Sequence, residues 1–293
     1  MCVTSVRAWT GIATGRLCRF IAILAAVAAL TIVLVRCAPG YFSDERLLDY
    51  QHYAVASTEV HHARDIAGST GQQIFNTLVA LSHGDLGRSR EFDIPVSELV
   101  APRAKNSAIL MCKSMLLGWA IAVTAACLGA SRRILDVSSA GIASLALAIP
   151  CSAMVTLSLV LDVGGPVLVM TVLIAARDFK YLVKIVEKTH FDSHVLQARA
   201  HGISDWNILR AHVLPSIAPD LAALGMLSII AGLGVLVPVE VLFNLSGIGQ
   251  LAWNAAMNRD LPVLVCSTLI IATVFTAAEV ASNLHHPWSQ YEA

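Results

Sequence analysis

Charged side chains are scarce in this sequence. Lysine, arginine, aspartate and glutamate make up 14% of the 293 residues, whereas hydrophobic residues make up 56%. Soluble globular domains usually carry about a quarter charged residues, so this shortage argues against a water-soluble fold and predicts a chain that lies largely in lipid. The 20 basic and 20 acidic side chains also balance, and without a basic field we expect no nucleic-acid partner.

Several kinds of site are missing from the sequence as well. The seven cysteines form no CxxC pair, and the histidines cluster only as His61-His62 and His285-His286, away from any group of carboxylates or thiols. We therefore expect neither a metal site nor a disulfide framework. The sequence also has no GxxxxGK[ST] phosphate loop, so the chain is not expected to bind ATP by that device. We predict no catalytic, cofactor-binding or metal-binding residue.

Long apolar runs are what the sequence does contain. A bilayer core about 30 Å thick needs about 20 apolar residues per helix, and lipid leaves backbone polar groups no partner outside a helix. The sequence therefore predicts an all-α polytopic membrane protein with six transmembrane helices. The six runs are Phe20–Val35, Asn106–Ala130, Val137–Leu161, Gly165–Ala176 with its continuation to Tyr181, Asp220–Phe243 and Pro262–Leu284.

The first apolar run has an alternative interpretation. Arg16 and Arg19 precede Phe20–Val35, as basic residues precede the apolar region of a secretory signal peptide. No small-x-small cleavage site follows, because Arg36 and Cys37 come next. We therefore expect a first transmembrane helix, with arginines at both ends that reach the two interfaces.

The distribution of lysine and arginine predicts the orientation. With the N-terminus inside, most basic residues of the short connections fall on the cytoplasmic side, whereas the short outer loops hold only Arg259. We expect a multi-pass protein of the inner (plasma) membrane with both termini cytoplasmic. Its predicted parts are 1–36 (N-terminus and first span), 37–105 (extracytoplasmic segment), 106–284 (transmembrane core, with a cytoplasmic loop at 177–218) and 285–293 (cytoplasmic tail).

The second half of that cytoplasmic loop has a helical pattern. Phe191, Val195 and Ala198 fall on one stripe of a helix, and Gly202 suits its end because glycine enters the left-handed region cheaply. A second amphipathic stretch follows, which Pro215 limits because the residue before a proline is pushed out of the α region. The loop is predicted to be two short helices with a glycine corner, and amphipathicity alone would also fit a pair lying on the membrane surface.

The spacing within the loop resembles the signature of a known family. Gln197-Ala198 is followed by Gly202 and then by Leu214-Pro215, which is similar to the signature loop of ABC importer permeases. The stretch ARAHG from Ala198 to Gly202 looks like the ARAKG form that is typical of peptide and nickel importer permeases. The narrower resemblance is therefore to the peptide/nickel type of permease subunit.

Further segments resemble the same family in the same order. Gly84–Leu99 is similar to the family's segment before its second span, Glu240–Leu251 and Arg259–Val263 match the connection between its last two spans, and Glu279 falls where the family keeps an acid in the final helix. The similarity covers about residues 80–287. Each motif alone is modest, but their order makes the resemblance specific.

The sequence also departs from the family pattern. His201 stands where lysine is usual, Ser246 where a proline precedes the Gly-x-Gly turn, and His285-His286 in place of the usual acidic ending. These departures bear on the details of coupling and on full activity, and not on the class of protein.

The resemblance implies a type I ABC permease fold and a transport subunit rather than an enzyme. It implies a second permease subunit, two cytoplasmic ATPase subunits that use ATP and Mg²⁺, and an extracytoplasmic solute-binding protein as partners, while this chain binds no cofactor. Di- or oligopeptides are the expected cargo, with nickel or another small solute as the alternative. The residues expected to form the ATPase-coupling loop are Gln197, Ala198, Arg199, Ala200, His201, Gly202, His212, Leu214 and Pro215.

Candidate pathway or outer-gate residues are few: Lys113, Glu240, Gly247 and Gly249. Lys113 lies inside the second predicted span, where a charge is costly, and either lines a wet cavity or reaches the outer interface. Glu240 either contacts substrate or the binding protein, or holds the Gly247–Gly249 turn, which is the favoured interpretation.

Two rival classes predict different sequences. A secondary transporter working alone would show repeated halves and charges at mid-membrane, and neither is evident. A polytopic membrane enzyme would need clustered His, Asp or Glu at one membrane face, whereas the predicted spans offer only Lys113, Glu279 and residues at their ends. Both classes therefore rank below the importer.

Overall fold

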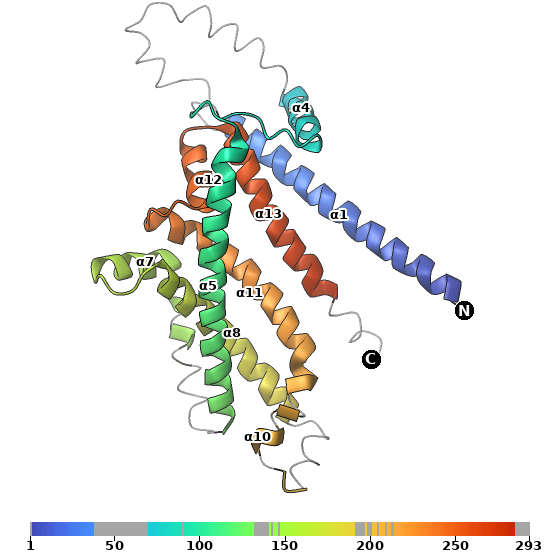
Figure 1. The fold of residues 1–293 in the computed structure, drawn as a ribbon, viewed down its shortest axis with the longest axis vertical. Coiled ribbons are helices and arrows are strands. Elements are labelled where there is room, and N and C mark those ends of the chain that lie inside the picture. Colours follow the sequence, from blue (N-terminus) through green and yellow to red (C-terminus); the bar gives the residue numbers. More distant parts are fainter. Residues whose placement is uncertain are drawn as a thin grey trace, which may run out of the picture. The chain divides into compact units, whose positions relative to one another are not determined.

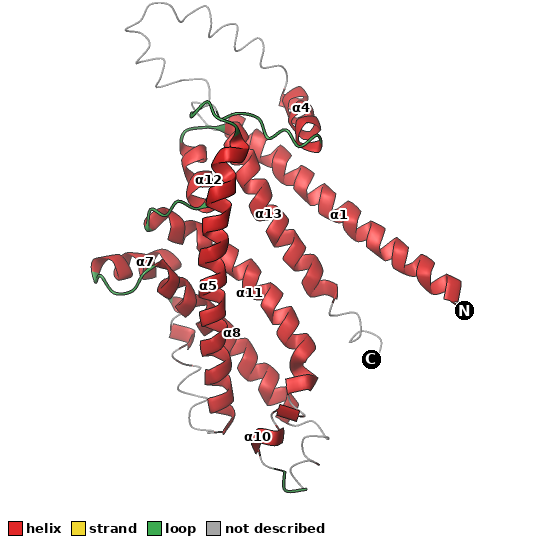
Figure 2. Cartoon of the chain, viewed as in Figure 1, coloured by secondary structure: helices red, strands yellow, loops and turns green. Residues whose placement is uncertain are grey.

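The computed structural model describes residues 2–37, 70–89, 91–131, 141, 143–145, 147–190, 197, 201–203, 205–208, 210–211 and 214–284. Regular structure in this part of the chain is helical, apart from an isolated bridge between Arg88 and Pro95. The helices drawn in Figures 1 and 2 are α1 (Cys2–Cys37), α4 (Thr70–Ser82), α5 (Val96–Ser131), α7 (Cys151–Val160), α8 (Pro166–His190), α10 (Asp205–Ile208), α11 (Leu214–Leu242), α12 (Ile248–Met257) and α13 (Leu261–Leu284).

Four segments of the described helices are long and apolar enough to cross a membrane. They are Cys18–Val35 of α1, Val96–Ala126 of α5, Pro215–Leu242 of α11 and Leu261–Ser282 of α13. These correspond to the first, second, fifth and sixth predicted spans, and they confirm the prediction of an all-α membrane protein. The count of six spans is not confirmed within the described residues.

The third predicted span, Val137–Leu161, is interrupted at Pro150. This proline has φ −56° and ψ 139° and directly precedes α7, a helix of 10 residues. A proline lacks the backbone N–H that an uninterrupted helix would need here, so Pro150 separates α7 from the helical residues before it. Positions 132–140, 142 and 146 lie outside the described residues.

The fourth predicted span continues further than the sequence suggested. Helix α8 runs to His190, so the first part of the loop expected at 177–218 is helical. Asp178, Phe179 and Leu182 are buried in this part of α8, and the contacts that bury them stabilise a helix whose charged residues had predicted a loop. At the other end of the loop, α11 begins at Leu214.

Residues Lys105–Gln250 and Val274–Ala293 form one compact unit. Within it α8 packs along α11, and α7 packs against both. Gly118 of α5 lies so close to α8 that a Cβ at this position would be 3.0 Å from Ile174 Cγ2, an approach that small residues allow between membrane helices. The buried residues of this core are Ala122, Ala126, Ala143, Phe179, Leu182 and Leu224.

The other compact unit comprises Met1–Ala104 and Leu251–Thr273. Within it α4 packs against α1. Its buried core is Ala28 and Ile32 of α1 with Val265 of α13. Partly buried Leu81 of α4 packs against this core, so a short helix outside the four spans is held by apolar contacts with them.

Candidate functional site

The loop predicted to couple to an ATPase connects α8 with α11. The backbone N–H of His201 donates to the carbonyl of Gln197 at 3.0 Å, which closes one helical turn. Gly202 follows with φ +74°, so the glycine corner predicted from the sequence is present. Gln197, His201 and Gly202 are exposed, and a Cβ at Gly202 would meet no atom within 4 Å. This corner is therefore accessible for contact with another protein.

The other predicted loop residues are only partly described. Ala198, Arg199, Ala200 and His212 lie outside the described residues. The predicted second loop helix is represented by α10, which ends at Ile208. Leu214 and Pro215 lie in the first turn of α11, whereas the sequence pattern placed them at the end of the second loop helix. A proline is accepted there because the first N–H groups of a helix have no internal partner.

Glu240 of α11 is the centre of a buried hydrogen-bonded cluster in the unit Lys105–Gln250. Its side chain is 1% exposed. Carboxylate Oε2 accepts the backbone N–H of Gly249 at 2.7 Å and that of Gln250 at 3.4 Å. Oε1 accepts the hydroxyl of Ser107 at 2.5 Å, and the same Ser107 oxygen accepts the N–H of Ile248 at 2.7 Å. The first three N–H groups of α12 thus have acceptors, and a carboxylate at a helix N-terminus is electrostatically favourable.

The two glycines of this connection make room for that carboxylate. A Cβ at Gly247 would overlap the carboxylate of Glu240, and one at Gly249 would lie 2.8 Å from the Cα of Val237. Neither φ is positive, so space and not backbone conformation requires glycine here. The structure therefore brings together three of the four predicted pathway residues, whereas Lys113 is exposed on α5 and takes no part in the cluster.

Asp178 is a buried acid that the sequence analysis did not single out. It lies in α8 at 0% exposure, and its Oδ2 accepts the hydroxyl of Ser228 of α11 at 2.7 Å. Ser228 is itself 1% exposed and accepts the indole N–H of Trp119 of α5 at 3.3 Å. Asp178 falls near the end, at Tyr181, of the fourth predicted span, among the end residues that the sequence analysis had set aside.

The neighbouring Arg177 makes a second connection from α8 to α11. Its Nη1 donates to the carbonyl of Leu227 at 2.8 Å, and its guanidinium lies over the ring of Tyr181, 5.5 Å from the ring centroid. The sequence predicts a loop from Arg177 onward, because three of the four residues from Arg177 to Lys180 are charged. The partners on α11 are 50 residues away, and no local pattern could have indicated them.

Two motif segments meet in the unit Met1–Ala104 with Leu251–Thr273. The hydroxyl of Ser89 donates to Asp260 Oδ2 at 2.5 Å, and the backbone N–H of Glu91 donates to the same oxygen at 3.3 Å. Gly87 lies beside Pro262, whose Cβ would be 3.7 Å from a Cβ at this glycine. The segment before α5 is therefore anchored on the residue that precedes α13.

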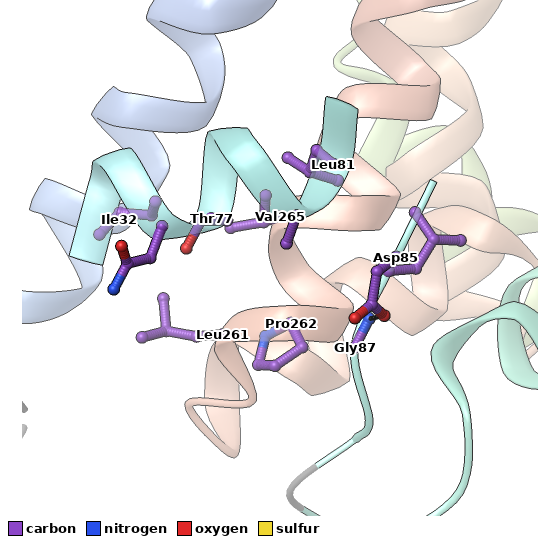
Figure 3. Close-up of a pocket in the computed structure, with 11 residues that line it drawn as sticks. Ile32, Thr77, Leu81, Asp85, Gly87, Leu261, Pro262 and Val265 are labelled. Atoms are coloured by element: carbon purple, nitrogen blue, oxygen red, sulfur yellow. Dashed lines mark hydrogen bonds between the residues drawn. The ribbon is translucent and has the colours of Figure 1, made fainter. Parts of the chain in front are cut away.

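A cavity of about 260 Å³ lies in the same unit (Figure 3). Its wall is mostly apolar and comes from α1, α4, the segment 85–87 and α13. Ile32, Leu81, Leu261 and Val265 form part of the apolar wall, and Asp85 supplies a carboxylate at one side. None of the predicted coupling-loop or pathway residues lines this cavity. Within the described residues, no group of three or more His, Cys, Asp or Glu is placed to hold a metal ion.

Comparison with known proteins defines the class. Residues 116–288 match the family described as "Binding-protein-dependent transport system inner membrane component". This match covers more than half of the chain and includes the loop, the Asp178 pair and the connection around Glu240. The fold and this match make the chain a helical membrane permease, a transport component. It belongs to the binding-protein-dependent transport system inner membrane component family, which confirms the resemblance found in the sequence.

Individual relatives match over most of their length. The chain is 28% identical over 271 residues to the oligopeptide transport system permease protein OppB of Salmonella typhimurium, covering 84% of this chain and 86% of that protein. Identity to OppB of Escherichia coli K12 is 27% over the same length. The nickel import system permease protein NikB of Staphylococcus aureus is 24% identical over 279 residues, which covers 87% of this chain and 83% of that protein.

Proposed function

We propose that this chain is one permease subunit of an ATP-driven, binding-protein-dependent ABC importer. The observation that carries the proposal is the family match over residues 116–288 together with an exposed glycine corner between two long helices. The chain would form half of the translocation pathway, with a second permease subunit as the other half. Two cytoplasmic ATPase subunits and an extracytoplasmic solute-binding protein would complete the assembly.

The loop between α8 and α11 would supply the link to the motor. The sequence has no phosphate-binding loop, so ATP and Mg²⁺ would be used by the partner ATPases and this chain would bind no cofactor. The exposed corner at Gly202 has no side chain and allows a close backbone approach. A loop that contacts cytoplasmic ATPases must itself lie on the cytoplasmic side of the inner membrane. The distribution of lysine and arginine favours the same side for the loop and for both termini.

Peptides are the proposed cargo. Identity to the two oligopeptide permeases is 28% and 27%, against 24% for the nickel permease over similar coverage. Nickel or another small solute is the second candidate, supported by the NikB relative. Lys113 is exposed on α5 of the single chain, and we propose that it lines the translocation pathway.

The assembly can be tested by purifying the tagged full chain from native membranes in mild detergent. We expect a second permease subunit and an ATPase to co-purify, and we expect the complex to hydrolyse ATP faster when the peptide-loaded binding protein is added. Uptake by the purified chain alone, driven by an ion gradient, would contradict the importer and favour a secondary transporter.

The coupling role of the loop can be tested by Gly202→Asp. Aspartate tolerates the left-handed conformation, so the main change is a negative charge at the exposed corner. We expect uptake to fall at least tenfold while the protein still inserts, and Gly202→Asn to retain most of the uptake. Gly84→Asp is the matched control, because Gly84 has φ +77° and an equally open surrounding. Normal uptake by the Gly202→Asp variant would contradict the proposal that this corner contacts an ATPase subunit.

A further inference from the structure

A polar contact between α8 and α11 lies inside the helical part of the chain. Asp178 Oδ2 accepts the hydroxyl of Ser228 at 2.7 Å, and both residues are fully or almost fully buried. The same hydroxyl lies 2.8 Å from the carbonyl of Leu224 in its own helix, but a carboxylate is the stronger acceptor. The serine oxygen also accepts the indole N–H of Trp119, so three helices meet at one hydroxyl.

A second contact beside the first limits sliding of the two helices. Arg177, adjacent to Asp178, donates to the carbonyl of Leu227, adjacent to Ser228. Two consecutive residues of α8 therefore hold two consecutive residues of α11. Helix packing without such bonds allows small shear movements between helices, whereas two hydrogen bonds at one level fix the relative height of the pair.

The contact between Asp178 and Ser228 lies at a similar distance from the loop along both α8 and α11. At 1.5 Å per residue, Asp178 lies about 18 Å along α8 from its end at His190, and Ser228 lies about 21 Å along α11 from its start at Leu214. The contact is therefore at nearly the same depth on both helices that flank the loop. Ser228 is also near the middle of the candidate span Pro215–Leu242. An ionisable residue at such a depth is costly and is usually retained for function.

We propose that Asp178 and Ser228 form a clasp that makes α8 and α11 move as one body when the loop between them is displaced. A pull on the loop would then reach mid-membrane through both helices at once, instead of being lost by sliding of one helix along the other. Asp178 and Ser228 are thus positioning residues for coupling. The inference rests on the proposed function, because it takes the loop as the point at which an ATPase pulls.

The clasp predicts a loss of coupling rather than a loss of ATP hydrolysis. In the assembled transporter in liposomes, Ser228→Ala should lower the amount of peptide taken up per ATP hydrolysed about tenfold, because the hydroxyl that bonds α11 to α8 is lost. Asp178→Leu should do the same, and the double variant should lose no more than either single one. Asp178→Asn keeps an acceptor oxygen and should retain at least a third of wild-type coupling.

Ser267→Ala is the matched control. Ser267 is 0% exposed, and its hydroxyl donates to the carbonyls of Val263 and Leu264 in its own helix. The control removes an equally buried hydroxyl whose hydrogen bonds to Val263 and Leu264 stay within α13, and its uptake per ATP should stay within twofold of wild type. The clasp would be overturned if Ser228→Ala matched this control, or if uptake and hydrolysis fell together with an unchanged ratio.

A second measurement separates the clasp from the proposed function. Spin labels at the exposed positions Lys184 of α8 and Ser216 of α11, introduced after replacement of the seven cysteines, report the distance between the two helices in the full chain alone. Ser228→Ala should broaden this distance distribution at least twofold, and Ser267→Ala should leave it unchanged. An unchanged width in Ser228→Ala refutes the clasp whether or not the transporter is ATP-driven, whereas a wild-type complex without ATP-driven uptake refutes the proposed function alone.

Discussion

The cluster around Glu240 makes a quantitative prediction for Glu240→Gln. The glutamine fits the same space but has one acceptor oxygen, so it can accept from Ser107 or from the N–H of Gly249 and cannot accept from both. Its amide N–H₂ group must then face the other donor. One hydrogen bond to a charged group contributes about 1.5–3 kcal/mol, and a buried donor left without acceptor costs about 1–3 kcal/mol. The two contributions overlap, because both describe the loss of the same acceptor, so we expect a destabilisation of about 2–4 kcal/mol.

Thermal unfolding of the full chain in nanodiscs is the assay. A change of 1 kcal/mol shifts Tm by about 2–4 °C for chains of 150–250 residues, so the variant should unfold roughly 5–15 °C below wild type. Glu279→Gln is the control, because it makes the same chemical change at an exposed position of α13 and should stay within about 0.5 kcal/mol of wild type. If both glutamine variants unfold together, Glu240 does not hold the start of α12, and contact with substrate or the binding protein becomes the better interpretation.

Two further changes test the packing around motif residues. Gly247→Ala places a Cβ on the Glu240 carboxylate and should lower the unfolding temperature. Gly234→Ala is the control, because a Cβ there meets no atom within 4 Å, and it should leave the unfolding temperature unchanged or raise it. Equal effects of the two variants would contradict the conclusion that Gly247 is required for space. Ser89→Ala removes the hydroxyl that anchors the segment before α5 on Asp260 and should speed proteolytic cleavage of that segment severalfold, and an unchanged cleavage rate would argue against the anchor.

Local sequence patterns predicted the features that depend on local physics. Apolar length located the segments within α1, α5, α11 and α13, because crossing a bilayer depends on a continuous apolar helix. The left-handed Gly202 was predictable since glycine is the residue that ends helices at low cost. Whether Pro150 kinks a helix or separates two helices depends instead on neighbouring contacts that the sequence does not display.

The features that depend on distant partners could not be predicted. The extension of α8 through Arg177 and Asp178 follows from contacts with α11, and the charged run by itself resembles a loop. Glu240 was recognised as a candidate, but its partner Ser107 is 133 residues away and is one of many serines. Propensity and hydropathy describe single residues and their neighbours, whereas these sites are defined by pairs.

The three buried acidic side chains of the described residues share one arrangement. Asp178, Glu240 and Asp260 each accept a hydrogen bond from a serine hydroxyl of another segment, 50, 133 and 171 residues away in sequence. Apolar burial discriminates poorly between alternative packings of membrane helices, because lipid tails are as apolar as leucine. A buried carboxylate does discriminate, since any arrangement that leaves it without a donor carries a high cost.

This arrangement explains why a chain so poor in charge keeps acids in its interior. Each Asp/Glu–serine pair selects one relative position of two segments, and a serine is small and weakly polar enough to be carried into an apolar helix at little cost. The pairs therefore specify the helix packing that apolar contacts leave open. Where the pair also flanks the loop, as Asp178 and Ser228 do, the bond that specifies the packing is the one placed to carry a displacement from the loop into the membrane.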